Sequence, residues 1–226
     1  MCGSMSLSRS DRLGAVLSVV SADRLPDSSG LSEFRLDTVG VVSEALRDQV
    51  RRTLTERDPI DDAERASIER TLTELDRLAD PFDRESDPIH VTGSAVVVGP
   101  RGVVLLKHKR LGLWLQPGGH VDAGETPWEG ALREAREETG LDVTFADVGD
   151  DGVPHLVHVD VHPGGRGHTH LDLRYLVHGG DADPTPPEGE SQEIAWFDWP
   201  DAIERASDDR LTALLHHLAP PRPVCS

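Results

Sequence analysis

A glycine-rich loop followed by a strongly helical sequence constrains this chain more than any other feature. Thr126 is a favourable N-cap, Pro127 suits the first helical position, and Glu129 stands three residues after Thr126, which completes a capping box. Gly140 supplies the left-handed residue at which helices commonly end. The sequence therefore predicts a loop that leads into a helix over residues 127–139.

The charges of this helix are badly placed for a helix in water. Glu134, Glu137 and Glu138 share one side, and like charges at i, i+3 and i+4 cost roughly 0.2–0.5 kcal/mol per pair. They also lie in the C-terminal half, where the helix dipole disfavours anions. A hard divalent cation with oxygen ligands would remove the conflict. The alternative is a solvated acidic face with Arg133 and Arg136 as partners. The side expected to face a core carries Trp128, Ala131, Leu132 and Ala135.

The spacing of the whole stretch favours the metal. Gly119 is followed by five residues, Glu125, seven residues and then Arg-Glu-Ala-x-Glu-Glu-x-Gly-Leu. Over residues 119–141 the chain resembles the Nudix hydrolases at every specified position of their sequence box. These enzymes hydrolyse a nucleoside diphosphate linked to a further group. The resemblance implies an α/β fold, a Nudix-type α/β/α sandwich with a mixed β-sheet.

The resemblance also implies which groups hold the metal, Mg²⁺ with Mn²⁺ as a substitute. Glu134, Glu137 and Glu138 become the principal metal and catalytic carboxylates. A backbone carbonyl at Gly118 or Gly119 becomes a further ligand, since glycine lets the backbone approach an ion closely.

Two further charged residues, Arg133 and Glu190, complete the expected catalytic set. Arg133 is expected to orient a neighbouring carboxylate and to pair with Glu125, which holds the loop on the helix. Nudix proteins often carry another acid, a metal ligand or base, before a Trp-Phe strand like the one near residue 196. Glu190 and Glu193 are both candidates, and Glu190 is our first choice.

The rest of the chain divides into three parts. We expect a flexible N-terminal segment over residues 1–30, a helical extension over 31–87 and the Nudix domain over 88–226. Apolar residues at helical spacing predict two antiparallel helices in the extension, at 36–54 and 61–78. They would pack against the main domain or against the second subunit of a homodimer. In the main domain, the pattern predicts strands at 91–98, 102–108, 113–115, 143–148, 155–162 and 168–177, and a final helix over 201–218.

The last two of these strands carry alternating polar side chains. One face of the first holds His158, Asp160 and His162, and one face of the second holds His168, His170, Asp172 and Arg174. Pairing through the glycine-rich turn would bring these faces together. They could bind a transition metal, contact the substrate, or form the polar side of a half-buried hairpin. We take His158, Asp160, His168, His170 and Arg174 as candidate substrate-binding residues.

Charge and composition limit the classes of molecule that this chain is expected to bind. The 226 residues carry a formal net charge of −18, which argues against extensive contact with nucleic-acid phosphates. The two cysteines, Cys2 and Cys225, suggest neither a disulfide framework nor a zinc site. No run approaches the ~20 apolar residues that span a bilayer. We expect a cytoplasmic protein that acts on a small nucleotide and has no membrane partner.

The expected activity is Mg²⁺-dependent hydrolysis of a pyrophosphate bond, with a nucleoside triphosphate or modified nucleotide as the first candidate substrate. ADP-ribose and nucleotide sugars are the alternatives within the same reaction. A different class of function, a non-catalytic Nudix-fold binding or regulatory module, is disfavoured because such modules often have degraded boxes. The box defines the reaction, whereas specificity must come from elsewhere in the chain.

Overall fold

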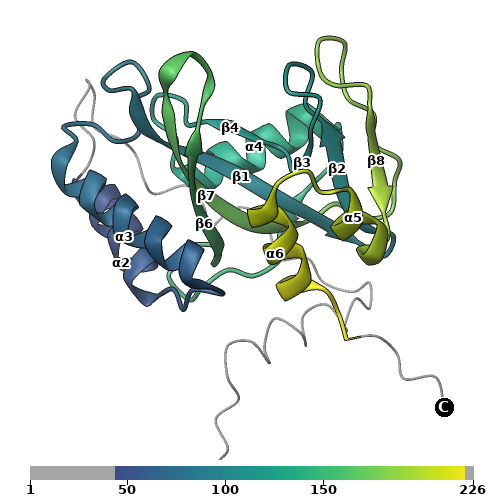
Figure 1. Cartoon of the computed structure of the whole chain (residues 1–226), viewed down its shortest axis with the longest axis horizontal. Coiled ribbons are helices and arrows are strands. Elements are labelled where there is room, and N and C mark those ends of the chain that lie inside the picture. Colours follow the sequence, from purple (N-terminus) through teal and green to yellow (C-terminus); the bar gives the residue numbers. More distant parts are fainter. Residues whose placement is uncertain (1–43, 222–226) are drawn as a thin grey trace, which may run out of the picture.

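The computed structural model of the chain describes residues 44–221 (Figure 1). The segment predicted to be flexible, 1–30, lies outside these residues, as does the first part of the helix predicted at 36–54. Within the described residues, no helix is both long and apolar enough to cross a membrane.

The N-terminal extension forms two helices, α2 (Glu44–Glu56) and α3 (Asp62–Arg77). The Asp61 side chain caps α3 by accepting a hydrogen bond from Glu64 N–H. The helices pack on each other and beside strand β6 at one end of the sheet (Figure 1). Their buried apolar side chains join the core of the main domain rather than forming a separate one; they are Leu46, Val50, Leu54, Ile68 and Leu75.

The main domain is built on one mixed sheet. Its strands are β1 (Ile89–Gly99), β2 (Gly102–Lys107), β3 (Trp114–Leu115), β4 (Gly118–His120), β5 (Thr144–Phe145), β6 (Leu156–Pro163), β7 (Thr169–His178) and β8 (Ile194–Phe197). Strand β1 runs parallel to β7, and the other pairings are antiparallel. Because β1 pairs with β4 on one side and with β7 on the other, it joins the glycine-rich loop to the polar hairpin.

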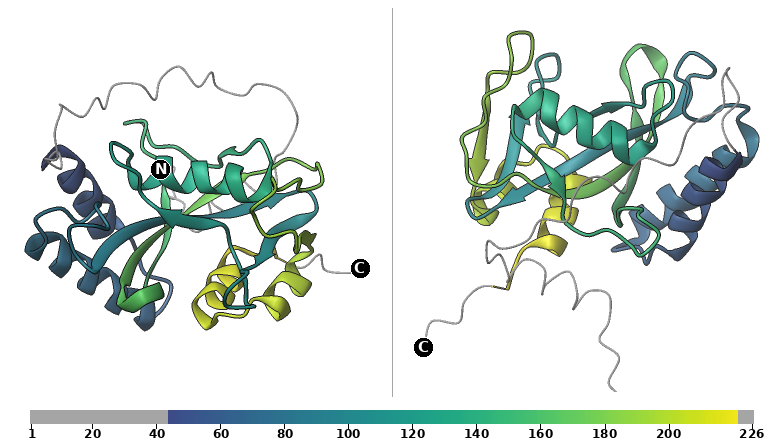
Figure 2. Two further views of the ribbon diagram at one scale, coloured as in Figure 1. Left: turned by 90° about the horizontal axis from the view of Figure 1, so that it is seen from above. Right: turned by 180° about the vertical axis from the view of Figure 1, so that it is seen from behind.

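Helices cover both faces of this sheet, as the view from above shows (Figure 2). Helix α4 (Pro127–Thr139) lies on one face, where Ala131 and Ala135 pack on β1. Helices α5 (Trp199–Arg205) and α6 (Asp209–Leu218) lie on the other, where they bury leucines against Val96 and Val98. The predicted α/β/α sandwich with a mixed sheet is therefore confirmed.

Glycine at position 93 allows α4 to lie close to the sheet. A Cβ atom at Gly93 would stand 2.2 Å from the carbonyl oxygen of Pro127. No real side chain tolerates that separation, so the first turn of the helix can rest directly on β1 only because residue 93 has no side chain.

Two predicted elements differ from the structure. The single helix expected over 201–218 is two helices, because Ser207 is tied to β3: its N–H donates to Trp114 O, and its Oγ accepts from Trp114 N–H at 3.0 Å. Asp208 then caps the second helix. The strand expected over 143–148 is a strand only at Thr144–Phe145, because the chain then turns back on itself: Val148 forms an isolated bridge with Pro154, and Gly149 N–H donates to Val153 O.

Candidate metal-binding and catalytic site

Helix α4 forms between the caps that the sequence predicts. Thr126 accepts a hydrogen bond from Glu129 N–H while Glu129 Oε2 accepts one from Thr126 N–H at 2.8 Å, so the capping box is complete. Gly140 adopts the left-handed conformation at φ 68°, and its N–H donates to Arg136 O. The side expected to face the core is buried. These local interactions hold the other side of the helix, with its glutamates, against the loop that precedes it.

The loop and the glutamates meet through backbone and carboxylate groups. Gly118 N–H donates to Glu138 Oε2 at 2.9 Å. A Cβ atom at Gly119 would stand 2.3 Å from Glu134 Oε1, so the backbone of β4 lies directly against that carboxylate. Glycine at 119 therefore leaves room for close approach of backbone and carboxylate oxygens.

Arg133 holds this arrangement in place. Its Nε donates to Glu125 Oε1, and its Nη1 donates to both Glu134 Oε1 and Glu137 Oε2, each at 2.9 Å. Its Nη2 donates to His120 O at 2.8 Å. The predicted pairing of Arg133 with Glu125 is confirmed. One guanidinium thus links the loop, the strand and two of the three glutamates.

The carboxylates are held in an environment that disfavours their charge. Burial raises the pKa of Glu138 to about 7, and the neighbouring negative charges of Glu134 and Glu190 add to the effect. Burial also raises the pKa of Glu134, although the hydrogen bond from Arg133 opposes this. The negative charges of these acids repel one another and are poorly solvated. A cation bound between the acids would therefore stabilise them.

The donor set fits a hard divalent cation. Glu134, Glu137 and Glu138 offer carboxylate oxygens on one side of α4, near a backbone that a glycine leaves open, and Mg²⁺ prefers oxygen ligands and few protein groups. Glu134 is largely buried, whereas Glu137 is half exposed. The cluster therefore has one carboxylate shielded from solvent, Glu134, and one that a hydrated ion can reach, Glu137.

Of the two candidates for the further acid, Glu190 lies closer to the site. It is half-buried, and its charge acts on Glu138. Glu193 is exposed and forms an ion pair with Lys107 at 2.9 Å. The geometry favours Glu190, our first choice, as the additional catalytic residue.

The polar hairpin forms as predicted, with the two faces side by side. Strands β6 and β7 pair His158 with Arg174, Asp160 with Asp172 and His162 with His170. The structure divides these residues into two groups. Those far from the turn are buried, and those near the turn are only partly covered.

The buried group is an ion network. Arg174, 2% exposed, donates to Asp172 Oδ2 and Asp160 Oδ2, both at 3.0 Å. Asp172 also accepts hydrogen bonds from Thr92 and Ser94 of β1. Arg174 and Asp160 are paired with each other in the interior, although Arg174 Nη1 has no hydrogen-bond partner, so they fit a structural role better than direct contact with a substrate. His158 is also fully buried beside them.

The group near the turn is a set of histidines. His168 and His170 approach His90, which begins β1, and His120, which ends β4; their ring centroids lie 5.1–5.3 Å from a neighbouring ring. Sequence analysis missed His90 and His120 as members of this group. They lie far from the hairpin in sequence, and only the pairing of β1 with both β4 and β7 brings them to it.

Comparison with known proteins agrees with this geometry. A family model described as the NUDIX domain matches residues 88–215, more than half of the chain. The chain belongs to the NUDIX family. It is a Nudix hydrolase, and the predicted family and enzyme class are confirmed.

Two similar proteins illustrate the relationship. An RNA pyrophosphohydrolase of Brucella ovis is 31% identical over an alignment of 125 positions, which covers 47% of this chain and 70% of that protein. The crystal structure of a NUDIX-family hydrolase from Clostridium perfringens is 26% identical, with a TM-score of 0.51 over 57% of this chain and 95% of that one.

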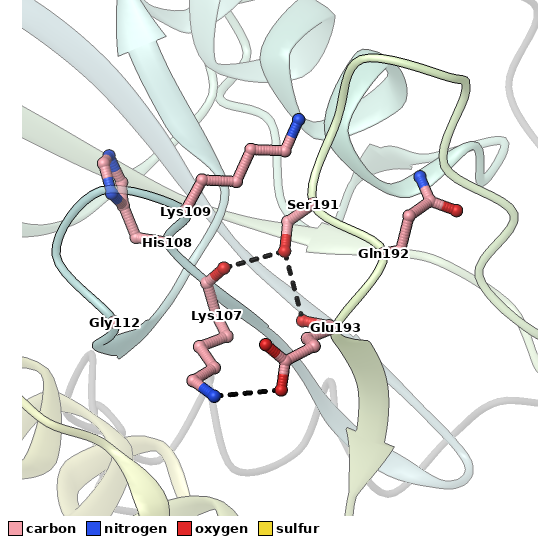
Figure 3. Close-up of a pocket in the computed structure, with 7 residues that line it drawn as sticks. All are labelled: Lys107, His108, Lys109, Gly112, Ser191, Gln192 and Glu193. Atoms are coloured by element: carbon pink, nitrogen blue, oxygen red, sulfur yellow. Dashed lines mark hydrogen bonds and ion pairs between the residues drawn. The ribbon is translucent and has the colours of Figure 1, made fainter.

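This Nudix hydrolase also has a pocket that sequence analysis did not anticipate. A cavity of about 430 Å³ lies between the end of β2 and the segment before β8 (Figure 3). Lys107 points toward Glu193, whereas Lys109 extends the other way and donates to Gly189 O. Ser191 Oγ closes the wall by donating to Lys107 O at 2.7 Å. Ser191, which lines the pocket, directly follows Glu190, the candidate additional acid, in the sequence. Its lining comes from two separate segments, so no contiguous motif could have revealed it.

Proposed function

We propose that this chain hydrolyses a pyrophosphate bond in a nucleoside diphosphate linked to another group, with Mg²⁺ as cofactor and a nucleoside triphosphate or modified nucleotide as the first candidate substrate. The observation that carries the proposal is the environment of Glu138. Its carboxylate is partly buried, is anchored by Gly118 N–H and has a pKa raised to about 7 beside two other acids. A site with these properties suits a bound cation and an acid–base step.

The chemistry requires charge neutralisation and a proton acceptor. The negative oxygens of a pyrophosphate repel nucleophiles, and Mg²⁺ supplies the compensating charge and lowers the pKa of a bound water. Glu134, Glu137 and Glu138, with the carbonyl of Gly118 or Gly119, are the groups that would hold the ion. Arg133 fixes two of these carboxylates, so we assign it a positioning role.

Glu138 and Glu190 are the proposed acceptors of the proton from the attacking water. The negative charge of Glu190 is one of the neighbouring charges that raise the pKa of Glu138, so the two acids act on the same site. A carboxylate whose pKa lies near neutral pH is a more effective base than one near 4, because the driving force for proton transfer is larger.

The pocket beside Glu190 is our candidate for the distal part of the substrate. Lys107 is paired with Glu193, so Lys109 is the ammonium group of this pocket that suits a phosphate or another anion. The hairpin histidines His168 and His170 remain candidate substrate contacts at the other side of the loop.

The test is a substrate panel with product identification. Purified full-length protein is incubated with Mg²⁺, or with EDTA, and with nucleoside and deoxynucleoside triphosphates, oxidised nucleotides, ADP-ribose and nucleotide sugars. Products are separated by ion-exchange chromatography, and hydrolysis in ¹⁸O-labelled water identifies the attacked phosphorus by mass spectrometry. We expect Mg²⁺-dependent cleavage of at least one compound, with the label in one of the two phosphate products.

A second candidate substrate, RNA with a 5′-triphosphate, enters the panel because the Brucella ovis relative is an RNA pyrophosphohydrolase. The net charge of −18 disfavours it, since a long polyanion gains little from this surface. A triphosphorylated oligonucleotide and the matching free nucleoside triphosphate are compared at equal concentration. Faster cleavage of the oligonucleotide would favour RNA. If no member of the panel is cleaved, the non-catalytic binding module becomes the better interpretation.

A further inference from the structure

Three imidazole rings meet on one side of the sheet, on three neighbouring strands. His90 and His170 are paired in register on β1 and β7, and His120 stands at the end of β4, opposite Thr92 of β1. The ring centroids of these three histidines are 5.1–5.3 Å apart. One ring nitrogen from each histidine lies within 4.8 Å of the other two. Three strands thus deliver three potential nitrogen ligands to one point.

His90 shows most clearly that the cluster is arranged for a ligand. Its side chain is fully buried, and its Nε2 has no hydrogen-bond partner. Its Nδ1 lies 3.3 Å from Asp87 O. A carbonyl oxygen can only accept, so Nδ1 carries the proton and Nε2 presents a lone pair. Metal-binding histidines commonly have this arrangement, in which a backbone carbonyl orients the ring through its other nitrogen.

We infer that His90, His120 and His170 form a second metal site, which takes a transition-metal ion of the Zn²⁺ class rather than Mg²⁺. Imidazole nitrogen suits Zn²⁺ and its neighbours, whereas Mg²⁺ requires oxygen ligands. Three protein ligands leave a fourth position open to water or to another group. The site goes beyond the proposed hydrolysis and does not depend on it.

The protonation of the rings agrees with this assignment. Burial lowers the pKa of His170 to about 4, and it also lowers the pKa of His90. These two rings are therefore neutral near pH 7, and neutral imidazole is the form that coordinates a metal.

The geometry needs only small adjustments to bind an ion. Tetrahedral Zn²⁺ with Zn–N bonds of about 2.0–2.1 Å places its ligand nitrogens roughly 3.4 Å apart. The ring nitrogens now lie within 4.8 Å of one another, so small side-chain rotations would bring them to the separation that Zn²⁺ requires. The rings of His162 and His168 border the cluster, at 5.3 Å from His170 and 5.2 Å from His90, and either is placed to approach the fourth position.

The surrounding charges are mixed. Asp172 lies two residues beyond His170 on the same face of β7, and its negative charge compensates part of the charge of a cation. Arg84 Nη1 lies 3.4 Å from His120 Nδ1 and opposes a cation there, but this arginine is exposed and can turn toward the solvent.

This site is separate from the glutamates of α4. Gly119 faces Glu134, and successive residues of a strand alternate between faces, so His120 points to the opposite side of β4. A metal on the histidines would join β4, which carries the catalytic loop, to β1 and β7. It would therefore fix the position of Gly118 and Gly119 from the face that α4 does not cover.

The experiment measures Zn²⁺ binding to tag-free, full-length protein stripped with a chelator. Competition with a chromophoric zinc indicator is followed in millimolar Mg²⁺, which occupies the carboxylates. We expect one tight equivalent of Zn²⁺ that Mg²⁺ does not displace. Glutamine at any of the three positions, His90→Gln, His120→Gln or His170→Gln, should weaken this binding at least about tenfold, the lower end of the effect of losing even an outer partner.

Matched controls separate the two sites. His216→Gln removes an exposed histidine of α6, and Glu138→Gln alters only the carboxylate cluster; both should keep the tight equivalent. Circular dichroism monitors folding, and the half-buried His120 provides a test if the buried His90 variant fails to fold. The proposal is overturned if Zn²⁺ binding is unchanged in folded His120→Gln and His170→Gln, or if Mg²⁺ displaces the ion completely.

Discussion

The amide N–H of Gly118 donates a hydrogen bond to Glu138 Oε2 at 2.9 Å. This contact joins the loop before the Nudix helix to the last turn of that helix. Burial, the largest effect, raises the pKa of Glu138, this hydrogen bond lowers it, and neighbouring acids raise it further, to about 7. The backbone thus positions a carboxylate whose charge is unfavourable without a cation.

Replacing Glu138 by glutamine tests this relationship. The glutamine carbonyl can still accept from Gly118 N–H, so we expect the fold and the thermal midpoint to be nearly unchanged. Without the negative charge and the basic oxygen, kcat on the best substrate should fall by at least about 10²-fold, the usual scale for a general acid–base group. The control is Glu204→Gln on the exposed side of α5, which should retain full activity. Near-normal turnover by Glu138→Gln would reject the assignment of this carboxylate.

The contact of α4 with β1 should be sensitive to one added methyl group. In Gly93→Ala the new Cβ would lie 2.2 Å from Pro127 O, which belongs to the backbone and cannot turn aside. We expect a loss of about 1–3 kcal/mol in the free energy of unfolding, as for other overpacked cores. Chemical denaturation measures this.

A glycine within the helix provides the opposite control. At Gly130 the nearest atom to an added Cβ is 3.4 Å away, an ordinary contact. Gly130→Ala should therefore raise the free energy of unfolding by roughly 0.5–1 kcal/mol, since alanine is the better helix former. Equal effects of the two substitutions would contradict the close packing of α4 on β1.

The buried arginine of the hairpin should matter for stability. Arg174→Leu would leave Asp160 and Asp172 in the interior without their cation, and breaking a buried ion pair typically costs about 3–5 kcal/mol. The exposed pair of Arg101 and Asp183 is the comparison, since such pairs contribute about 0–1 kcal/mol. Urea denaturation of Arg174→Leu and Arg101→Leu measures both. A loss for Arg174→Leu no larger than that for Arg101→Leu would show that the network contributes little.

Acid should destabilise the protein through His158. Burial, and then the positive charges of Arg174 and Arg57, lower the pKa of His158 from 6.5 to about 3. The folded state therefore keeps this ring neutral. The unfolded chain takes up a proton below pH 6.5, so stability is lost as the pH falls from 6.5 toward 3.

The contribution of His158 to the pH dependence of the unfolding free energy can be measured by substitution. One proton contributes about 1.4 kcal/mol of unfolding free energy per pH unit. His158→Leu should reduce the slope between pH 6 and pH 4 by about that amount, whereas His216→Gln, at an exposed site, should leave it unchanged. Denaturation curves at several pH values measure the slopes. The same slope in His158→Leu and in the unsubstituted protein would contradict a neutral, buried His158.

Local signals in the sequence determined a large part of this structure. The caps of α4 at Thr126 and Gly140, its buried side and the grouping of its glutamates follow from spacing along a single helix. The strands of the hairpin and the common face of His158 and Asp160 follow in the same way from alternation with period two. These features depend on neighbours within a few residues, which is why sequence alone was sufficient for them.

The tertiary structure decided which residues from distant segments come into contact. The contact of Ser207 with Trp114 divided a sequence that reads as one helix into two. The register of β1 with β7 placed Thr92 beside Asp172, which turned candidate substrate contacts into a buried ion network. The same pairing brought His90 to His170, and the pairing of β1 with β4 brought His120 to both. These outcomes depend on which strands pair and in which register, and that is decided by the packing of the whole core rather than by any local pattern.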